Sequence, residues 1–221
     1  MRTETARTDG STARRGRPPG TSARALEVIA LELFTTHGFD ETTIDHIAAA
    51  AGVSKRTFFR YFDSKADVLW SAFDLEVDSI RRELHDLPES LPVMDAVRHA
   101  VLAVNHYRAD DVPELRARMK LIGSVPELGA SAAVHYDAWE QAVTDYVARR
   151  THRSADSLFP RTVGRVTLAA CRAGYEQWAV QADGDLTVYL DAALRGLAAG
   201  FSDSFLTSSA GVSKLSTSTE A

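Results

Sequence analysis

The chain has 221 residues, of which 45% are hydrophobic and 25% charged, and its formal net charge is −5 at pH 7. This composition is typical of globular proteins, and the single cysteine excludes a disulfide-stabilised scaffold. No stretch of 18 apolar residues and no apolar leader is present, so we expect a cytoplasmic protein without a membrane segment.

Charge is distributed unevenly along the chain. Residues 1–24 contain six Arg and two acidic residues, whereas residues 66–221 contain 15 basic and 22 acidic residues. Such a distribution predicts that the N-terminal part meets an anionic partner. Residues 1–20 and 207–221 are rich in small and polar residues, so we expect a flexible basic arm and a disordered tail.

Helical periodicity dominates the sequence between these ends, and no stretch alternates apolar and polar residues long enough for a strand. The expected fold class is therefore all-α, with about nine helices and two domains. Residues 21–65 form a three-helix head, residues 66–206 form a larger body, and the fourth helix is their only rigid link. The expected helices cover residues 23–37, 44–51, 55–62, 65–87, 93–108, 112–124, 127–152, 157–181 and 186–206.

The segment 43–62 is the most informative part of the sequence, because it indicates a helix, a turn at Gly52 and a second helix. The second helix has a cationic face, which a helix-turn-helix inserts into the major groove of DNA. Arginine can hydrogen-bond the guanine edge at two atoms, whereas hydroxyls and lysines hold phosphates. An ordinary helical hairpin with a solvated basic face is the alternative. The candidate DNA contacts in the head are Thr43, Lys55, Arg56, Thr57, Arg60, Tyr61 and Lys65.

These residues also carry a family resemblance. The run from Leu33-Phe34 through Gly38-Phe39, Ala51-Gly52-Val53-Ser54 and Tyr61-Phe62 resembles the head of the tetracycline-repressor (TetR) family of bacterial regulators. The resemblance covers residues 22–70 and implies an all-helical homodimer that binds a palindromic operator through its heads and a small-molecule inducer through its body. More narrowly, the head and residues 16–20 resemble regulators encoded beside mycofactocin biosynthesis genes.

The resemblance assigns roles to the individual head residues. Lys55, Arg56 and Arg60 match the base-reading positions of the family. Phe59 stands where many members have an aromatic hydroxyl, so any contact from that hydroxyl is absent here. The phosphate-contacting positions of the family are matched by Thr43, Thr57, Tyr61 and Lys65.

The N-terminal arm contains a second candidate DNA contact. Arg15 and Arg17 flank Gly16 and precede Pro18, which is the pattern of a minor-groove hook, where arginines follow the negative potential of a narrow groove. A flexible, solvated tail is the alternative interpretation.

The body lacks the sequence motifs of common enzymes. No Gly-x-Ser-x-Gly elbow, dinucleotide fingerprint or phosphate loop is present. No Cys or His set has zinc spacing. We therefore expect neither enzymatic activity nor a cofactor or metal. We expect Cys171 to be a small buried hydrophobic residue, with a redox sensor as the alternative.

Aromatic and aliphatic residues with a few polar groups follow the body helices, as a ligand cavity requires. A packed core shows the same pattern. Asn105, Tyr107, Trp139 and Arg172 are the candidate ligand contacts. We interpret the cluster of Arg116, Arg118 and Lys120 as solvated surface, and a site for an anionic headgroup is the alternative. The expected effector is an apolar or amphipathic molecule, with fatty acyl-CoA among the candidates.

The last two helices predict a dimer contact. They combine an apolar stripe with small residues that allow close helix approach across a two-fold axis, although packing within one chain is the alternative. The candidate interface residues are Ala170, Leu190, Leu194, Gly196, Leu197, Gly200 and Phe201.

Together these features predict a ligand-responsive, DNA-binding transcriptional regulator. The expected mode is a repressor associated with the nucleoid and released from its operator by a small molecule. A regulator without a small-molecule ligand and a non-specific architectural DNA-binding protein are the alternatives.

Overall fold

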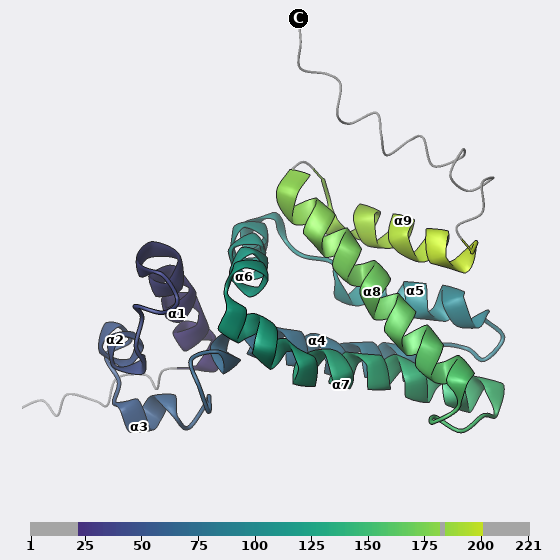
Figure 1. The fold of residues 1–221 in the computed structure, drawn as a ribbon, viewed down its shortest axis with the longest axis horizontal. Helices are drawn as coiled ribbons and strands as arrows, with labels where there is room; N and C mark the ends of the chain where they lie inside the picture. The colour runs from purple at the N-terminus through teal and green to yellow at the C-terminus, as the bar shows by residue number, and fades with distance from the viewer. Residues whose placement is uncertain (1–21, 182–183, 201–221) are drawn as a thin grey trace, which may run out of the picture.

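A computed structural model describes residues 22–181 and 184–200. Within these ranges the chain forms nine α-helices, one short 3₁₀ turn and no strand (Figure 1). The all-α prediction is therefore confirmed for the described residues. None of the helices in these ranges has the length and apolar character needed to cross a membrane.

The head consists of helices α1 (Ala23–His37), α2 (Ile44–Ala50) and α3 (Lys55–Phe58). Ser22, Thr43 and Ser54 cap them as expected, each accepting a hydrogen bond from a backbone N–H in the first turn. The third helix is shorter than predicted. After Phe58 the backbone continues in tighter turns, such as the 2.9 Å hydrogen bond from the Tyr61 N–H to the Phe58 carbonyl.

The body helices largely follow the predicted ranges. The fourth helix begins two residues later than expected. The fifth ends earlier, at Val104, and the side-chain amide of its C-cap residue Asn105 donates to the Val101 carbonyl at 2.8 Å. Prolines stand at the starts of two later helices, where a missing N–H costs little. The body helices are α4 (Asp67–Asp86), α5 (Val93–Val104), α6 (Val112–Ser124), α7 (Pro126–Thr151), α8 (Leu158–Gln181) and α9 (Leu186–Ala198), with the 3₁₀ turn at Ala109–Asp111.

Two hydrophobic cores hold the chain together. The head core is built around aromatic rings, with Phe34, Phe39, Phe58 and Phe62 all buried. It extends beyond the predicted head boundary to Leu69 of α4 and Leu128 of α7, neither of which has exposed surface. The body core lies between α4, α5, α7, α8 and α9.

Helix α6 connects the two cores. It stands beside α1 in Figure 1 and packs against α1, α7 and α8. Ala117, Leu121 and Ile122 pack against the head core, whereas Leu115 belongs to the body core. The prediction that the fourth helix is the only link between head and body is therefore wrong. The head rests on three body helices, because its own core is too small to bury all its apolar surface.

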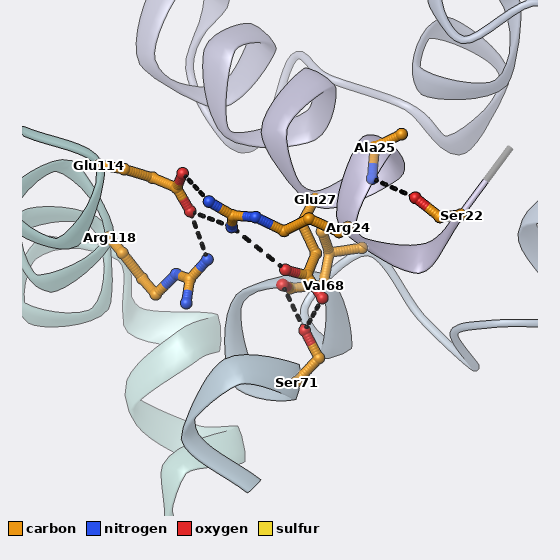
Figure 2. A network of polar contacts seen from close by, with 8 residues as sticks. All are labelled: Ser22, Arg24, Ala25, Glu27, Val68, Ser71, Glu114 and Arg118. Atoms are coloured by element: carbon orange, nitrogen blue, oxygen red, sulfur yellow. Dashed lines mark hydrogen bonds and ion pairs between the residues drawn. The ribbon is translucent and has the colours of Figure 1, made fainter. Parts of the chain in front are cut away.

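A chain of charged side chains reinforces this contact (Figure 2). Arg24 of α1 donates two hydrogen bonds of 2.5 Å to the two carboxylate oxygens of Glu114 of α6. Glu27 of α1 lies 3.4 Å from Arg24 and accepts a 2.7 Å hydrogen bond from Ser71 of α4. On the other side of Glu114, Arg118 donates a 3.0 Å hydrogen bond. We call Arg24, Glu114 and Arg118 the junction.

Candidate functional site

Local interactions fix both the start of α2 and the turn between α2 and α3, which together form a helix-turn-helix. Thr43 accepts a 3.2 Å hydrogen bond from the His46 N–H, and the His46 ring nitrogen accepts one from the Thr43 N–H in return. Gly52 has a φ of +65°, a conformation that glycine adopts without strain. This geometry fixes the direction in which α3 leaves the turn.

The predicted base-reading face lies on the surface. Lys55, Arg56 and Arg60 are exposed, and Thr57 is half-buried. The Lys55 ammonium lies 2.9 Å from Asp45 of α2, and both side chains are more than half exposed. Arg60 donates a 2.8 Å hydrogen bond to the Tyr61 hydroxyl. Exposed pairs of this kind are weak, so the basic side chains can exchange them for DNA at low cost.

Lys65 has a different environment. Its ammonium donates to the carbonyls of Phe39 at 2.8 Å and Thr42 at 3.4 Å, and lies 4.1 Å from the centre of the Phe39 ring. It thereby ties the start of α4 to the loop after α1. A phosphate contact by Lys65 remains a prediction, and it would compete with these contacts. Arg15 and Arg17, the predicted minor-groove contacts, lie outside the described residues.

The body contains a cavity of about 990 Å³. Its walls come from α4, α6, α7 and α8, with the end of α5. Most of the wall is apolar, including the rings of Trp70, Phe73 and Trp139. The cavity reaches the surface, because exposed residues such as Lys120 and Val180 also line it. Its size and lining suit a small molecule.

Three of the four predicted ligand contacts line this cavity, namely Asn105, Trp139 and Arg172. Tyr107 is not part of the lining. Its hydroxyl donates to Glu76, which does line the cavity. The structure thus places Tyr107 behind the wall, where it supports a polar group.

Glu76 was missed by the sequence reasoning. It follows Phe73 by three residues and precedes Ile80 by four on α4, and this apolar face was a usable signal. Burial raises the pKa of the Glu76 carboxyl to about 7, although the Tyr107 hydrogen bond and the charge of Arg118 partly oppose the shift. Nearby, Tyr175 donates to Asn105, so the cavity contains a hydrogen-bonded polar cluster.

Cationic side chains gather on the same wall. Arg116, Arg118, Lys120 and Arg172 line the cavity, against the acidic Glu76 and Glu176. Arg172 lies 3.8 Å from Glu176 and covers the Tyr136 ring at 4.9 Å. The interpretation of the α6 cluster as solvated surface is wrong for Arg118, whose side chain is 7% exposed, because α6 lies between the two cores. The cavity is therefore both apolar and cationic.

The predicted dimer residues divide into two groups. Leu190 and Leu194 have no exposed surface in the protomer, and Gly196 is also buried. These three cannot offer area to a second chain, which corrects that part of the prediction. They are buried because α9 packs closely on α8. A Cβ added at Gly174 would lie 3.2 Å from the Leu190 side chain.

The remaining predicted dimer residues are more accessible. Ala170 and Leu197 are half-buried and Gly200 is exposed, whereas Phe201 lies outside the described residues. Exposed apolar residues such as Val166 and Val188 stand on the same two helices. Accessible apolar residues therefore remain on both α8 and α9.

Cys171 is buried, as predicted, and lines the cavity. Burial raises the pKa of its thiol to about 12, so the reactive thiolate is scarce at neutral pH. This does not favour the redox-sensor alternative. In the part of the chain that the structure describes, no three His, Cys, Asp or Glu side chains are placed to hold a metal ion.

Comparison with known proteins identifies the family to which the chain belongs. Residues 29–71 match the model of bacterial regulatory proteins of the tetR family, and residues 91–202 match the MftR C-terminal domain. A Mycobacterium tuberculosis protein named as a mycofactocin biosynthesis transcriptional regulator, MftR, is 33% identical over 84% of this chain and 93% of its own length.

Two solved structures show the same fold. The Thermus thermophilus repressor FadR, crystallised with lauroyl-CoA, has a TM-score of 0.53 at 23% identity and covers 80% of this chain and 93% of its own. SmeT of Stenotrophomonas maltophilia, in complex with triclosan, has a TM-score of 0.57 at 18% identity and covers 79% of this chain and 90% of its own. The chain therefore belongs to the TetR family of bacterial regulators, with a body of the MftR C-terminal type.

Proposed function

We propose that the protein is a ligand-responsive transcriptional repressor of the bacterial cytoplasm. Residues 21–65 would read a palindromic operator and residues 66–206 would bind the effector and a second protomer. The observation that carries the proposal is the cavity of about 990 Å³ in the body. A regulator that responded to no small molecule would gain nothing from such a space, because filling a cavity with side chains stabilises a protein.

On the DNA side, the exposed cationic face of α3 would enter the major groove. Arginines there can hydrogen-bond guanine edges, and the hydroxyls would position the phosphate backbone. The basic arm would follow the adjacent minor groove. The proposed DNA contacts are Arg15, Arg17, Thr43, Lys55, Arg56, Thr57, Arg60, Tyr61 and Lys65.

On the ligand side, four cationic and two acidic side chains line an otherwise largely apolar space. The carboxyl of Glu76 is partly neutral at pH 7 because its pKa is raised to about 7. The excess positive charge favours an amphipathic anion with a long apolar part. Fatty acyl-CoA is the leading candidate class, and FadR was crystallised with lauroyl-CoA.

A palindromic operator requires two heads, so we propose a homodimer through the exposed faces of α8 and α9. Ala170, Leu197 and Gly200 are the predicted interface residues that keep accessible surface. Substitution of the exposed Ala173 by Glu should give a monomer in light scattering. A variant that stays dimeric would place the contact on another face.

The function can be tested by fluorescence anisotropy with labelled DNA from the region beside the gene. We expect discriminating binding relative to a scrambled duplex, and release on addition of lauroyl-CoA but not of coenzyme A alone. Equal binding to both duplexes would favour the architectural alternative. Retention of DNA at a saturating concentration of lauroyl-CoA would refute this effector class.

A matched pair of variants shows whether the cavity itself is the effector site. Ala132 is buried and lines the cavity, whereas Ala130 of the same helix is exposed and does not. Ala132→Phe should retain DNA binding and lose the response to lauroyl-CoA. Ala130→Phe should behave like the unmodified protein. An equal response from both variants would place the effector elsewhere.

A further inference from the structure

Arg118 is a buried cation with an incomplete set of partners. Its side chain is 7% exposed, and it lines the cavity. Its Nη2 donates to Glu114 at 3.0 Å, but its Nε is buried without a hydrogen-bond partner among the described residues. An unsatisfied N–H of a buried charged group is costly, and such groups are rarely left so without a reason. The unpaired Nε therefore marks a position for a hydrogen-bond acceptor.

The shape of the guanidinium indicates which acceptor fits. Nε and Nη2 lie on one edge of the group, and a carboxylate or phosphate can accept from both atoms of such an edge at once. At Arg118 one atom of this edge is unpaired and the other is occupied by Glu114. Nη2 has two N–H groups, but an anion that binds the whole edge comes beside the Glu114 carboxylate at Nη2, and the two like charges repel each other.

Glu114 is also the residue through which α6 holds the head. Its carboxylate accepts both 2.5 Å hydrogen bonds from Arg24 of α1 as well as the one from Arg118 (Figure 2). Arg24 is about half exposed, whereas Arg118 is buried. Arg118 is thus the inner support that keeps the Glu114 carboxylate oriented toward Arg24.

Helix α6 itself also connects the cavity with the head. Ala117 and Ile122 of α6 pack against the head core and also line the cavity, together with Arg116, Met119 and Lys120. A single helix therefore faces ligand and head at once. A change on its cavity side alters the surface on which α1 rests.

We propose that the anionic group of the effector binds the Nε–Nη2 edge of Arg118, displaces Glu114 from it, and so loosens the Arg24–Glu114 contact that fixes the head on α6. This inference rests on the proposed function, because it concerns the same cavity. It assigns the junction two roles, recognition of a carboxylate or phosphate and transmission of its arrival to the head. Arg118 is a positioning residue for the head in the absence of effector.

The recognition step is tested with Arg118→Met, which keeps the volume but removes the charge. Binding of lauroyl-CoA and of uncharged dodecanol is followed by the fluorescence of Trp70 and Trp139, which line the cavity. Loss of the charged hydrogen bonds should weaken lauroyl-CoA binding at least about tenfold. Dodecanol binding should be unchanged and the melting temperature retained. Equal affinity of Arg118→Met and the unmodified protein for lauroyl-CoA would overturn the assignment.

The transmission step is tested with Glu114→Gln. DNA affinity is measured with and without saturating lauroyl-CoA, and the ratio of the two values is the coupling. We expect a coupling of about tenfold or more in the unmodified protein. In Glu114→Gln the effector-free protein should bind DNA more weakly and the coupling should approach one, while lauroyl-CoA still binds. A Glu114→Gln protein with undiminished coupling would refute the transmission role.

Asp191→Asn provides a matched control. Asp191 also bridges two arginines, Arg98 at 2.5 Å and Arg195 at 2.9 Å, but it lies on α9 and does not line the cavity. Its substitution should leave the coupling unchanged, and an equal loss in both variants would contradict a specific role for Glu114. If lauroyl-CoA fails to bind the unmodified protein, both this inference and the proposed effector class fail. If it binds and releases DNA equally in all variants, only this inference fails.

Discussion

The head and the body are both helical, but their interiors differ. The head core is filled by phenylalanine rings, with Phe34 and Phe39 4.9 Å apart and Phe58 and Phe62 5.5 Å apart between ring centres. The body contains the three longest of the described helices, α4, α7 and α8, which line a cavity of about 990 Å³. A filled core holds the helices of the head in one geometry, whereas a cavity leaves space that a small molecule can fill. The comparison indicates that the two regions have different tolerances to the same substitution.

The largest expected effect comes from applying one substitution to both regions. Phe58 has no exposed surface in the head core, whereas Phe73 is half-buried and lines the cavity. Phe58→Ala should lower the free energy of unfolding by about 3–5 kcal/mol, because it opens a new void. Phe73→Ala should cost only about 1 kcal/mol, because it enlarges an existing space. Urea denaturation measures both values. Equal losses of unfolding free energy in the two variants would contradict the different tolerances of head and body.

An intermediate effect is expected at Glu76. Its pKa is raised from 4.5 to about 7, so the folded state binds more protons than the unfolded state between these values. This carboxyl therefore lowers stability increasingly as pH rises from about 4.5, and fully above about 7. Glu76→Gln should add about 2 kcal/mol at pH 8 and almost nothing at pH 4.5. A gain of the same size at both pH values would show that ionisation is not the cause.

The smallest effect on stability is expected at the predicted base-reading face. The Lys55–Asp45 pair is exposed on both sides, so Asp45→Asn should change the free energy of unfolding by less than about 0.5 kcal/mol. The same change frees Lys55 and removes a negative charge, so DNA affinity should rise severalfold at low salt and less at high salt. Anisotropy titrations at two salt concentrations measure this, with Asp137→Asn on the exposed face of α7 as a control. If Asp45→Asn left the DNA affinity unaltered, Lys55 would not be a DNA contact.

Local signals predicted most of the fold. The caps at Ser22, Thr43 and Ser54 and the prolines at the starts of α6 and α7 depend on nearby residues, which a sequence displays directly. The early end of α3 was not predicted, because the apolar spacing continues to Phe62 whether the backbone is an α-helix or a series of tight turns.

The candidate site was predictable only in part. Aromatic and polar residues on helical faces indicated Asn105, Trp139 and Arg172, which line the cavity. The partner of Arg24 was not predictable, because Glu114 lies 90 residues away and the spacing of charges along one helix says nothing about another. The burial of Arg118 was missed for the same reason, because it depends on where α6 packs.

The burial of Leu128 in the head core has a consequence for exchanging specificities between related regulators. A head cut at residue 65 and grafted onto another body would leave behind Leu69, Leu128 and the α6 residues on which it rests. The predicted base-reading residues Lys55, Arg56 and Arg60 are exposed and do not belong to the head core, so they can be varied singly. A transplanted head should therefore function only when the recipient body offers matching contact residues on α4, α6 and α7. Whether a grafted head is compatible should depend on these residues more than on the operator.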